Sequence, residues 1–169
     1  LDMVLSQGTG GAGFGLLKGT GQIGILLEVI FVFETSDRKG VDVNRFLPSL
    51  PLRVVVNHTG EELTADYPVE MLNKQLRPGR IDDLIDNETL VDVIIPEMIE
   101  TATEIAEQLK LAEIEKGISR LNQTLDHEID RLAYLSKRNK GIRPDEIRRA
   151  LADKKLLSTL IGNARIRMD

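Results

Sequence analysis

Cysteine and tryptophan are both absent from the 169 residues of this chain. Without cysteine there can be no disulfide framework, no thiolate zinc site and no cysteine nucleophile. Aromatic residues make up only 4% of the chain, so the core must be mostly aliphatic. No apolar run approaches the roughly 18 residues that a membrane span needs, and the N-terminus lacks the pattern of a signal peptide. We therefore expect a cytoplasmic protein with no membrane partner.

Convincing nucleotide-binding motifs are also missing. The pattern G-x-G-x-x-G occurs at Gly8–Gly13 and at Gly19–Gly24. A dinucleotide site needs such glycines between a strand and a helix, where backbone N–H groups and the helix dipole meet the pyrophosphate. The first copy is followed by more glycine, the second runs into a predicted strand, and no Walker motif occurs. We interpret residues 1–25 as a glycine-rich lead-in that is irregular or extended.

The two histidines do not indicate a metal site. His58 lies in a predicted turn, and His127 lies on a predicted long helix. Acidic residues surround His127 in the sequence, but successive helix positions point in different directions and do not converge on one ion. A solvated polar face explains them better. We expect no metal-binding, cofactor-binding or catalytic residue in this chain.

Two apolar runs, Leu26–Glu34 and Pro51–Asn57, predict β-strands because they are rich in branched and aromatic residues. The near-continuous apolar character of the first predicts a strand that is central in its sheet or covered on both faces. A charged turn is predicted at Asp37–Gly40. A tight hairpin loop is predicted at Asn57–Gly60, followed by a third strand near Glu61–Ala65. Three antiparallel strands are the minimum that could form a stable face.

Helical patterns follow these strands. A short helix is predicted from Val69 to Leu76, ending before the breaker Arg77–Arg80. Another is predicted to start near Ile81, where capping and dipole effects account for the acids Asp82, Asp83 and Asp86. A long helix is predicted from Glu97 onward, with Pro96 at or near its first turn.

Apolar spacing continues along the long helix and predicts its buried face. The series consists of Met98, Ala102, Ile105, Leu109 and Ala112, and after a shift of Ile114, Ile118, Leu121, Leu125, Ile129, Leu132 and Leu135. Asn139–Gly141 is predicted to end this helix. Pro144 is predicted to open a return helix with an apolar face at Ile147, Leu151, Leu157 or Ser158, and Ile161.

The predicted fold is therefore α+β: a small antiparallel β-sheet of about three strands packed with α-helices, including a long C-terminal antiparallel helical hairpin. A length of 169 residues corresponds to about one domain. We divide residues 1–169 into the lead-in 1–25, a β-rich part 26–76 and a helical part 81–169. The chain begins with Leu1 and stops at Arg167–Asp169 inside a predicted helical pattern, so we expect a piece of a larger protein.

Charge is distributed unevenly. Residues 136–169 hold ten basic and four acidic side chains, a net charge of +6, whereas residues 1–135 carry −11 of the total of −5. The predicted hairpin tip contains four basic residues, Lys137, Arg138, Lys140 and Arg143. They would suit phosphates of DNA or RNA, or an acidic protein surface, although no aromatic residue is interleaved among them. The alternative is that the basic return helix complements its acidic neighbour, which carries Glu97, Glu100, Glu104 and Glu107.

Four segments together carry a family resemblance: Leu26–Glu34, Arg45–Pro48, Pro51–Asn57 and Met71–Leu76. They resemble the C-terminal domain of the RapA family, the bacterial RNA polymerase-associated ATPases of the RNA polymerase recycling group. The helices predicted after Asp83 occur in the same order as in that domain. The resemblance therefore covers essentially the whole chain and is strongest over its first half.

The resemblance implies a parent protein that binds core RNA polymerase and DNA and promotes polymerase recycling during transcription. It implies a helicase-like hydrolase motor that uses ATP and Mg, in the bacterial cytoplasm at the nucleoid. The motor motifs of the family lie upstream in the parent, and none of them occurs in this sequence. No catalytic residue is therefore carried over to this chain.

Three hypotheses remain open after the sequence. The first is a non-catalytic accessory domain that packs on the ATPase motor or contacts RNA polymerase. The second is a nucleic-acid contact module that acts through the basic hairpin tip. The third, an independent nucleotide-dependent enzyme, is favoured only by the glycine pattern.

Overall fold

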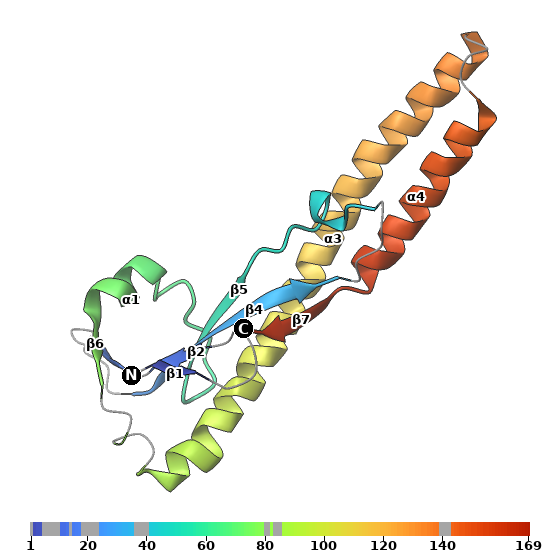
Figure 1. Cartoon of the computed structure of the whole chain (residues 1–169). Coiled ribbons are helices and arrows are strands. Elements are labelled where there is room, and N and C mark those ends of the chain that lie inside the picture. The colour runs from blue at the N-terminus through green and yellow to red at the C-terminus, as the bar shows by residue number, and fades with distance from the viewer. Residues whose placement is uncertain are drawn as a thin grey trace. The chain divides into compact units, whose positions relative to one another are not determined.

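The computed structural model (Figure 1) describes residues 2–4, 11–13, 15–17, 24–35, 41–79, 82, 86–138 and 143–169. Its contacts divide the chain into two compact units. The first unit comprises Leu1–Val32, Pro51–Gln108 and Arg167–Asp169, and the second comprises Phe33–Leu50 and Leu109–Ile166.

The largest sheet has three strands in the order β5-β4-β7. Their bounds are Leu52–Asn57 for β5, Leu26–Glu34 for β4 and Arg165–Met168 for β7. β4 pairs antiparallel with β5, and the arrow of β7 runs opposite to that of β4 in Figure 1. The two strands predicted from the apolar runs are thus confirmed, and β4 is central as expected. Alternate residues of β4 are buried, whereas Val54, Val55 and Val56 of β5 are all buried, so β5 is the strand covered on both faces.

The third strand of this sheet is not the predicted one. Glu61–Ala65 forms only an isolated bridge between Glu62 and Val56. The Val55 carbonyl accepts from the Leu63 N–H, but the Val55 N–H donates to the Thr64 side chain at 3.0 Å, so a hydroxyl replaces the next backbone partner. The N–H groups of Asp66 and Tyr67 then donate to the Leu63 carbonyl, which bends the chain away from the sheet.

The third strand comes instead from Arg165–Met168, which was wrongly predicted to be helical. The helix before it ends at Gly162, and the Asp169 N–H donates to the Ile30 carbonyl at 2.9 Å. The sequence Arg-Ile-Arg-Met alternates polar and apolar residues, and Ile166 is half-buried between exposed Arg165 and Arg167. This period of two is typical of a strand.

Two further pairs of short strands lie in the first unit. β1 (Asp2–Val4) pairs antiparallel with β2 (Gly11–Gly13), and β3 (Gly15–Leu17) pairs antiparallel with β6 (Leu76–Pro78). The glycine-rich lead-in is therefore extended at residues 2–4, 11–13 and 15–17 and bends at Gly24, and part of the predicted breaker at Arg77–Arg80 is a strand. A Cβ at Gly15 would lie 2.8 Å from the Arg77 carbonyl oxygen, so only glycine allows this close pairing.

The hairpin loop predicted at Asn57–Gly60 is confirmed. The Gly60 N–H donates to the Asn57 carbonyl at 3.0 Å, and Gly60 has a φ of 80°, which favours glycine. The short predicted helix is α1, Val69–Gln75, and a 3₁₀ turn, η1, covers Val43–Arg45. The turn predicted at Asp37–Gly40 lies outside the described residues.

The long helix begins earlier than predicted. Pro96 is the second residue of α3 (Ile95–Arg138) and lies in its first turn, as predicted, but a π-helical turn, η2 (Leu90–Ile94), leads directly into α3. Proline has no N–H to donate, and its ring crowds the carbonyl four residues earlier. The π turn uses longer-range backbone bonds, such as that from the Ile95 N–H to the Leu90 carbonyl, and directly precedes the proline.

The helix predicted near Ile81 is described only in part. Asp82 is helical, and its carbonyl accepts from the Asp86 N–H at 3.0 Å. Ile81 and Asp83 lie outside the described residues. The start of this helix therefore stays a prediction.

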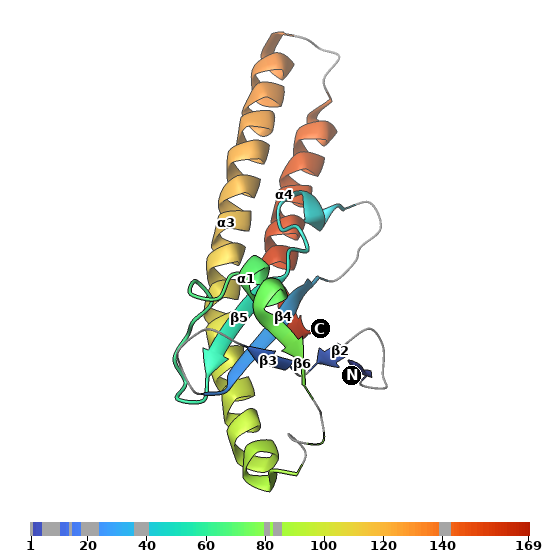
Figure 2. The same cartoon turned by 90° about the vertical axis from the view of Figure 1, so that its left-hand side faces the viewer.

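In the second unit, the C-terminal part of α3 lies antiparallel beside α4 (Pro144–Gly162), as Figures 1 and 2 show. Pro144 stands at the first position of α4, and Asp145 and Glu146 lie in its first turn, as predicted. The predicted fold class is thus confirmed. The helix end predicted at Asn139–Gly141 lies outside the described residues.

The core of the second unit combines aliphatic side chains with Phe33 and Phe46. Leu121 of α3 and Ile161 of α4 are 0% exposed. Phe46 and Leu47, which follow η1 in the sequence, are also buried. A Cβ at Gly117 of α3 would lie 3.2 Å from the Phe46 carbonyl oxygen and 3.4 Å from Ile161 Cγ2. The absent side chain at Gly117 therefore lets these segments approach α3 closely.

Part of the predicted apolar face is wrong. Leu109 and Ala112 of α3 and Leu151 of α4 are exposed, and Leu151 is 50% exposed. Ile114 and Leu121 of the predicted series are buried, which confirms these two positions. Gly117 is also buried between them, and a pattern of apolar side chains does not include a glycine.

The core of the first unit combines β4, β5 and the start of α3. Val54, Val56, Met98, Ala102 and Ala106 are each at most 2% exposed, which confirms the predicted positions of Met98 and Ala102. Arg53 of β5 forms a set of polar contacts beside this core. Its guanidinium donates to the Glu28 carboxylate and to the carbonyls of Tyr67 at 2.5 Å and Thr64 at 3.4 Å. The Arg53 side chain thus connects β5 by hydrogen bonds to the segment that bends away after Leu63.

Candidate interaction surfaces

The predicted basic tip lies at the end of the helical hairpin. Lys137 and Arg138 occupy the last turn of α3, and Arg143 immediately precedes Pro144 of α4. All three side chains are exposed. Cations in the last turn of a helix also interact favourably with its dipole, which accounts for part of their placement. Lys140 lies outside the described residues.

An exposed aromatic residue lies beside this tip and was missed by the sequence reasoning. Tyr134 is 52% exposed, and the Arg138 guanidinium carbon lies 4.7 Å from the centroid of its ring. Tyr134 and Arg138 are four positions apart, which places them on one helix face. That spacing is the signal that would have found the pair.

The same face of α3 carries further polar residues. His127 and Arg131 precede Tyr134 at helical spacing, and both are exposed, whereas buried Leu121 lies on the opposite face. Asp130 is exposed on this outward face as well. The face is therefore basic only near its end, from Arg131 to the tip.

An ion pair connects the two helices of the hairpin. The Lys154 ammonium of α4 lies 2.6 Å from the Asp126 carboxylate of α3. This contact favours part of the alternative predicted above, in which basic residues of the return helix complement α3. The acid involved is Asp126 and not one of the four predicted glutamates. Lys137, Arg138 and Arg143 have no ion-pair partner within the described ranges.

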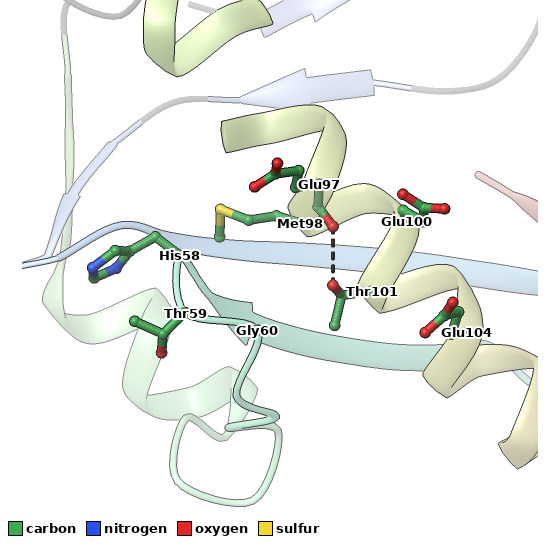
Figure 3. Close-up of a pocket in the computed structure, with 8 residues that line it drawn as sticks. All are labelled: His58, Thr59, Gly60, Glu97, Met98, Glu100, Thr101 and Glu104. Atoms are coloured by element: carbon green, nitrogen blue, oxygen red, sulfur yellow. Dashed lines mark hydrogen bonds between the residues drawn. The ribbon is translucent and has the colours of Figure 1, made fainter. Parts of the chain in front are cut away.

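The predicted acids at the start of α3 line a hollow of about 370 Å³ in the first unit. Figure 3 shows the carboxylates of Glu97, Glu100 and Glu104 on successive turns of α3, with the imidazole of His58 pointing away from them. That ring packs on Gly24, where a Cβ would lie 3.1 Å from His58 Cε1. His58 thus has a structural role in the loop.

The two threonine hydroxyls at this hollow donate to oxygen atoms of neighbouring residues. The Thr101 hydroxyl donates to the Glu97 carbonyl at 2.9 Å, and the Thr59 hydroxyl donates to Asn57 Oδ1 at 2.7 Å. Neither donates to a histidine, which is one arrangement that activates a hydroxyl nucleophile. Among the described residues, no group of three or more acidic or histidine side chains could hold a metal ion.

A second hollow, of about 610 Å³, belongs to the second unit and is lined by Glu34, Thr35, Asn163 and Arg165.

The described glycines of the two G-x-G-x-x-G patterns lie in strand β2 and in the bend before β4, not at the start of a helix. This geometry does not resemble a phosphate-binding loop. Across the described residues, no helix combines the length and the apolarity needed to cross a membrane.

Comparison with known proteins identifies the family. The model of the C-terminal domain of the RNA polymerase recycling family, RapA_C, matches residues 1–169. The chain belongs to this family. The resemblance inferred from the strands and from Met71–Leu76 is thus confirmed.

Curated relatives agree with this family. RNA polymerase-associated protein RapA from Actinobacillus succinogenes is 32% identical over 87% of this chain. The proteins of the same name from Vibrio parahaemolyticus and Erwinia tasmaniensis are 30% and 32% identical over the whole chain. The chain spans only 15–18% of the length of these relatives. It therefore corresponds to their RapA C-terminal domain and not to the rest of their length.

Proposed function

We propose that this chain is a non-catalytic interaction domain of an RNA polymerase-associated ATPase that promotes polymerase recycling in transcription. The observation that carries the proposal is the family match over all 169 residues. The relatives that match it are RNA polymerase-associated proteins by name. In this proposal the domain works in the bacterial cytoplasm at the nucleoid.

The non-catalytic part of the proposal is supported by the surfaces described above. The hydroxyls at the acidic hollow donate to their own neighbours, and the described glycine motifs are strands and bends. ATP and Mg act in a motor outside this chain, and this domain needs no cofactor of its own. Its partners are core RNA polymerase and the parent ATPase motor.

Removing this domain from the full-length protein is expected to weaken binding to core RNA polymerase at least tenfold, or about 1.4 kcal/mol. Biolayer interferometry with immobilised polymerase measures this change. ATP hydrolysis in the absence of polymerase is the control, and we expect it to persist because the motor lies elsewhere. Unchanged polymerase affinity, or saturable ATP binding by the isolated chain in calorimetry, contradicts the proposal.

A second candidate function is nucleic-acid contact through the hairpin tip. The exposed basic residues Lys137, Arg138 and Arg143 favour it, together with the Tyr134 ring beside them. Such a contact would act alongside polymerase binding and would depend on salt, because phosphate binding releases counterions.

Reversing the tip charges tests this second function. The variant Lys137→Glu, Arg138→Glu, Lys140→Glu and Arg143→Glu is expected to lose most of its affinity for an oligonucleotide. The slope of log affinity against log salt should shrink by up to about 3, since each phosphate contact on a single strand contributes about 0.7. Fluorescence anisotropy between low and high salt measures both changes. Lys74→Glu, on an exposed position of α1, is the control. Equal slopes in the tip variant and the unaltered chain would refute the tip contact.

A further inference from the structure

We propose that Tyr134 is a stacking platform for an unpaired base, so that the tip of the α3–α4 hairpin binds single-stranded nucleic acid in preference to duplex. This inference rests on the second candidate function and names the chemical class of its ligand. It also assigns a binding role to Tyr134.

The exposure of Tyr134 is the first observation. A tyrosine that only packs in a core would be buried, as Tyr67 is at 7% exposure, whereas Tyr134 is 52% exposed on the outward face of α3. The Arg138 guanidinium lies over its ring at 4.7 Å. A base can stack on the open face of the ring or take the place of the guanidinium.

The neighbouring cations supply the second observation. Arg131, Lys137, Arg138 and Arg143 are exposed and have no ion-pair partner in the described part of the chain. Arg131 and Arg138 lie three and four positions from Tyr134 along α3, and Arg138 contacts its ring. Stacking residues surrounded by Arg and Lys are the arrangement that single-strand binding surfaces use, because every base offers a flat face and every nucleotide a phosphate. Arg138 can serve both parts, since its planar group stacks and binds phosphate.

The charge pattern along α3 disfavours a duplex. Toward the middle of the helix, the exposed acids Glu128 and Asp130 alternate with His127 and Arg131, whereas Asp126 is paired with Lys154. These carboxylates would repel the phosphates of a duplex lying along the helix, and the basic region is confined to the tip. A flexible single strand can place one base on Tyr134 and its adjacent phosphates on the tip without meeting the acids. Bases inside a duplex offer no free face to the ring.

The test compares Tyr134→Ala with Tyr134→Phe in the 169-residue chain. Fluorescence anisotropy measures affinity for a labelled oligonucleotide and for a duplex of the same length at low salt. We expect Tyr134→Ala to weaken single-strand binding about tenfold and Tyr134→Phe to remain within about threefold of the unaltered chain, because phenylalanine keeps the ring. Duplex binding should be weaker at the outset and should not depend on the ring. Leu151→Ala, at an exposed position of α4, is the control for a lost exposed side chain.

Each outcome decides a different part of the proposal. If Tyr134→Ala binds the single strand as tightly as the unaltered chain, or if the duplex binds equally well, the stacking role is wrong. If the tip-charge variant loses nucleic-acid affinity while Tyr134→Ala does not, the second candidate function stands and only the stacking inference falls. Substitutions at Tyr134 and the tip could instead weaken binding to nuclease-treated RNA polymerase and leave binding to nucleic acid unchanged. The surface would then be a protein contact, and both the second candidate function and the stacking inference would be wrong.

Discussion

Replacing Leu121 with alanine is expected to lower the free energy of unfolding by about 3 to 4 kcal/mol. Leu121 is 0% exposed and is among the largest side chains in the chain that are fully buried. The loss combines the transfer free energy of the removed methyl groups with the cavity that they leave. Since a typical domain is stable by only about 5 to 15 kcal/mol, this single change would remove a large share of the total.

Urea unfolding followed by far-UV circular dichroism measures this loss as a lower midpoint at an unchanged slope. Leu111→Ala is a close control, because Leu111 lies on the same helix but is 59% exposed. The control should change stability by less than about 0.5 kcal/mol. Similar midpoints for the two variants would mean that Leu121 is not packed as the structure describes.

Replacing Gly117 with valine is expected to cost about 2 to 3 kcal/mol, although valine has a better helix propensity than glycine. A Cβ there would already lie 3.2 Å from the Phe46 carbonyl oxygen, 3.4 Å from Ile161 and 3.6 Å from Leu47. Two further methyl groups would force the segment at Phe46 or helix α4 away from α3. The opposing gain in helix propensity is below about 1 kcal/mol, so overpacking decides the sign.

The same urea titration measures the Gly117→Val variant. Gly162→Val is the matched control, because Gly162 lies in α4 and a Cβ at that position would meet nothing within 4 Å. The control should be neutral or slightly stabilising. If Gly117→Val were as stable as Gly162→Val, the close approach at Gly117 would not constrain the packing of the second unit.

Elements with strong local signals were predictable from the sequence. The apolar runs of β4 and β5, the loop closed by Gly60 and the return helix opened by Pro144 all follow from residues within the element itself. Their hydrophobic period, turn residues and helix-start residues agree with one another, and such agreement makes a local prediction reliable. The apolar spacing also predicted the long helix, but it did not predict where that helix begins.

Elements that depend on distant partners were not predictable in the same way. β7 has only four residues, and a short alternating run next to a helix is easily taken for the end of that helix. Leu63 and Thr64 were expected to continue a strand, but a side-chain hydroxyl competes there with the backbone ladder. Pro96 lies in the first turn of α3 as predicted, but no sequence rule indicates the π turn that extends the helix before it.

The candidate site was predicted in part. Charge alone identified Lys137, Arg138 and Arg143, which the structure leaves exposed at the tip of the hairpin. Tyr134 precedes the four cations in the sequence and is not interleaved among them, but helical spacing brings its ring to Arg138. Exposure separates a binding tyrosine from a core tyrosine, and the sequence does not reveal it.

The position of β7 beside β4 has a consequence for synthesis on the ribosome. β4 and β5 can pair as soon as they emerge, but the other edge of β4 has its partner only after both long helices have been translated. At roughly 5 to 20 residues per second, this interval is on the order of 10 s. Throughout it, the backbone N–H and C=O groups along that edge, including the Ile30 carbonyl that later accepts from Asp169, are open to pairing with another nascent chain. The β4 edge is therefore the segment of this domain for which we expect a chaperone to matter most.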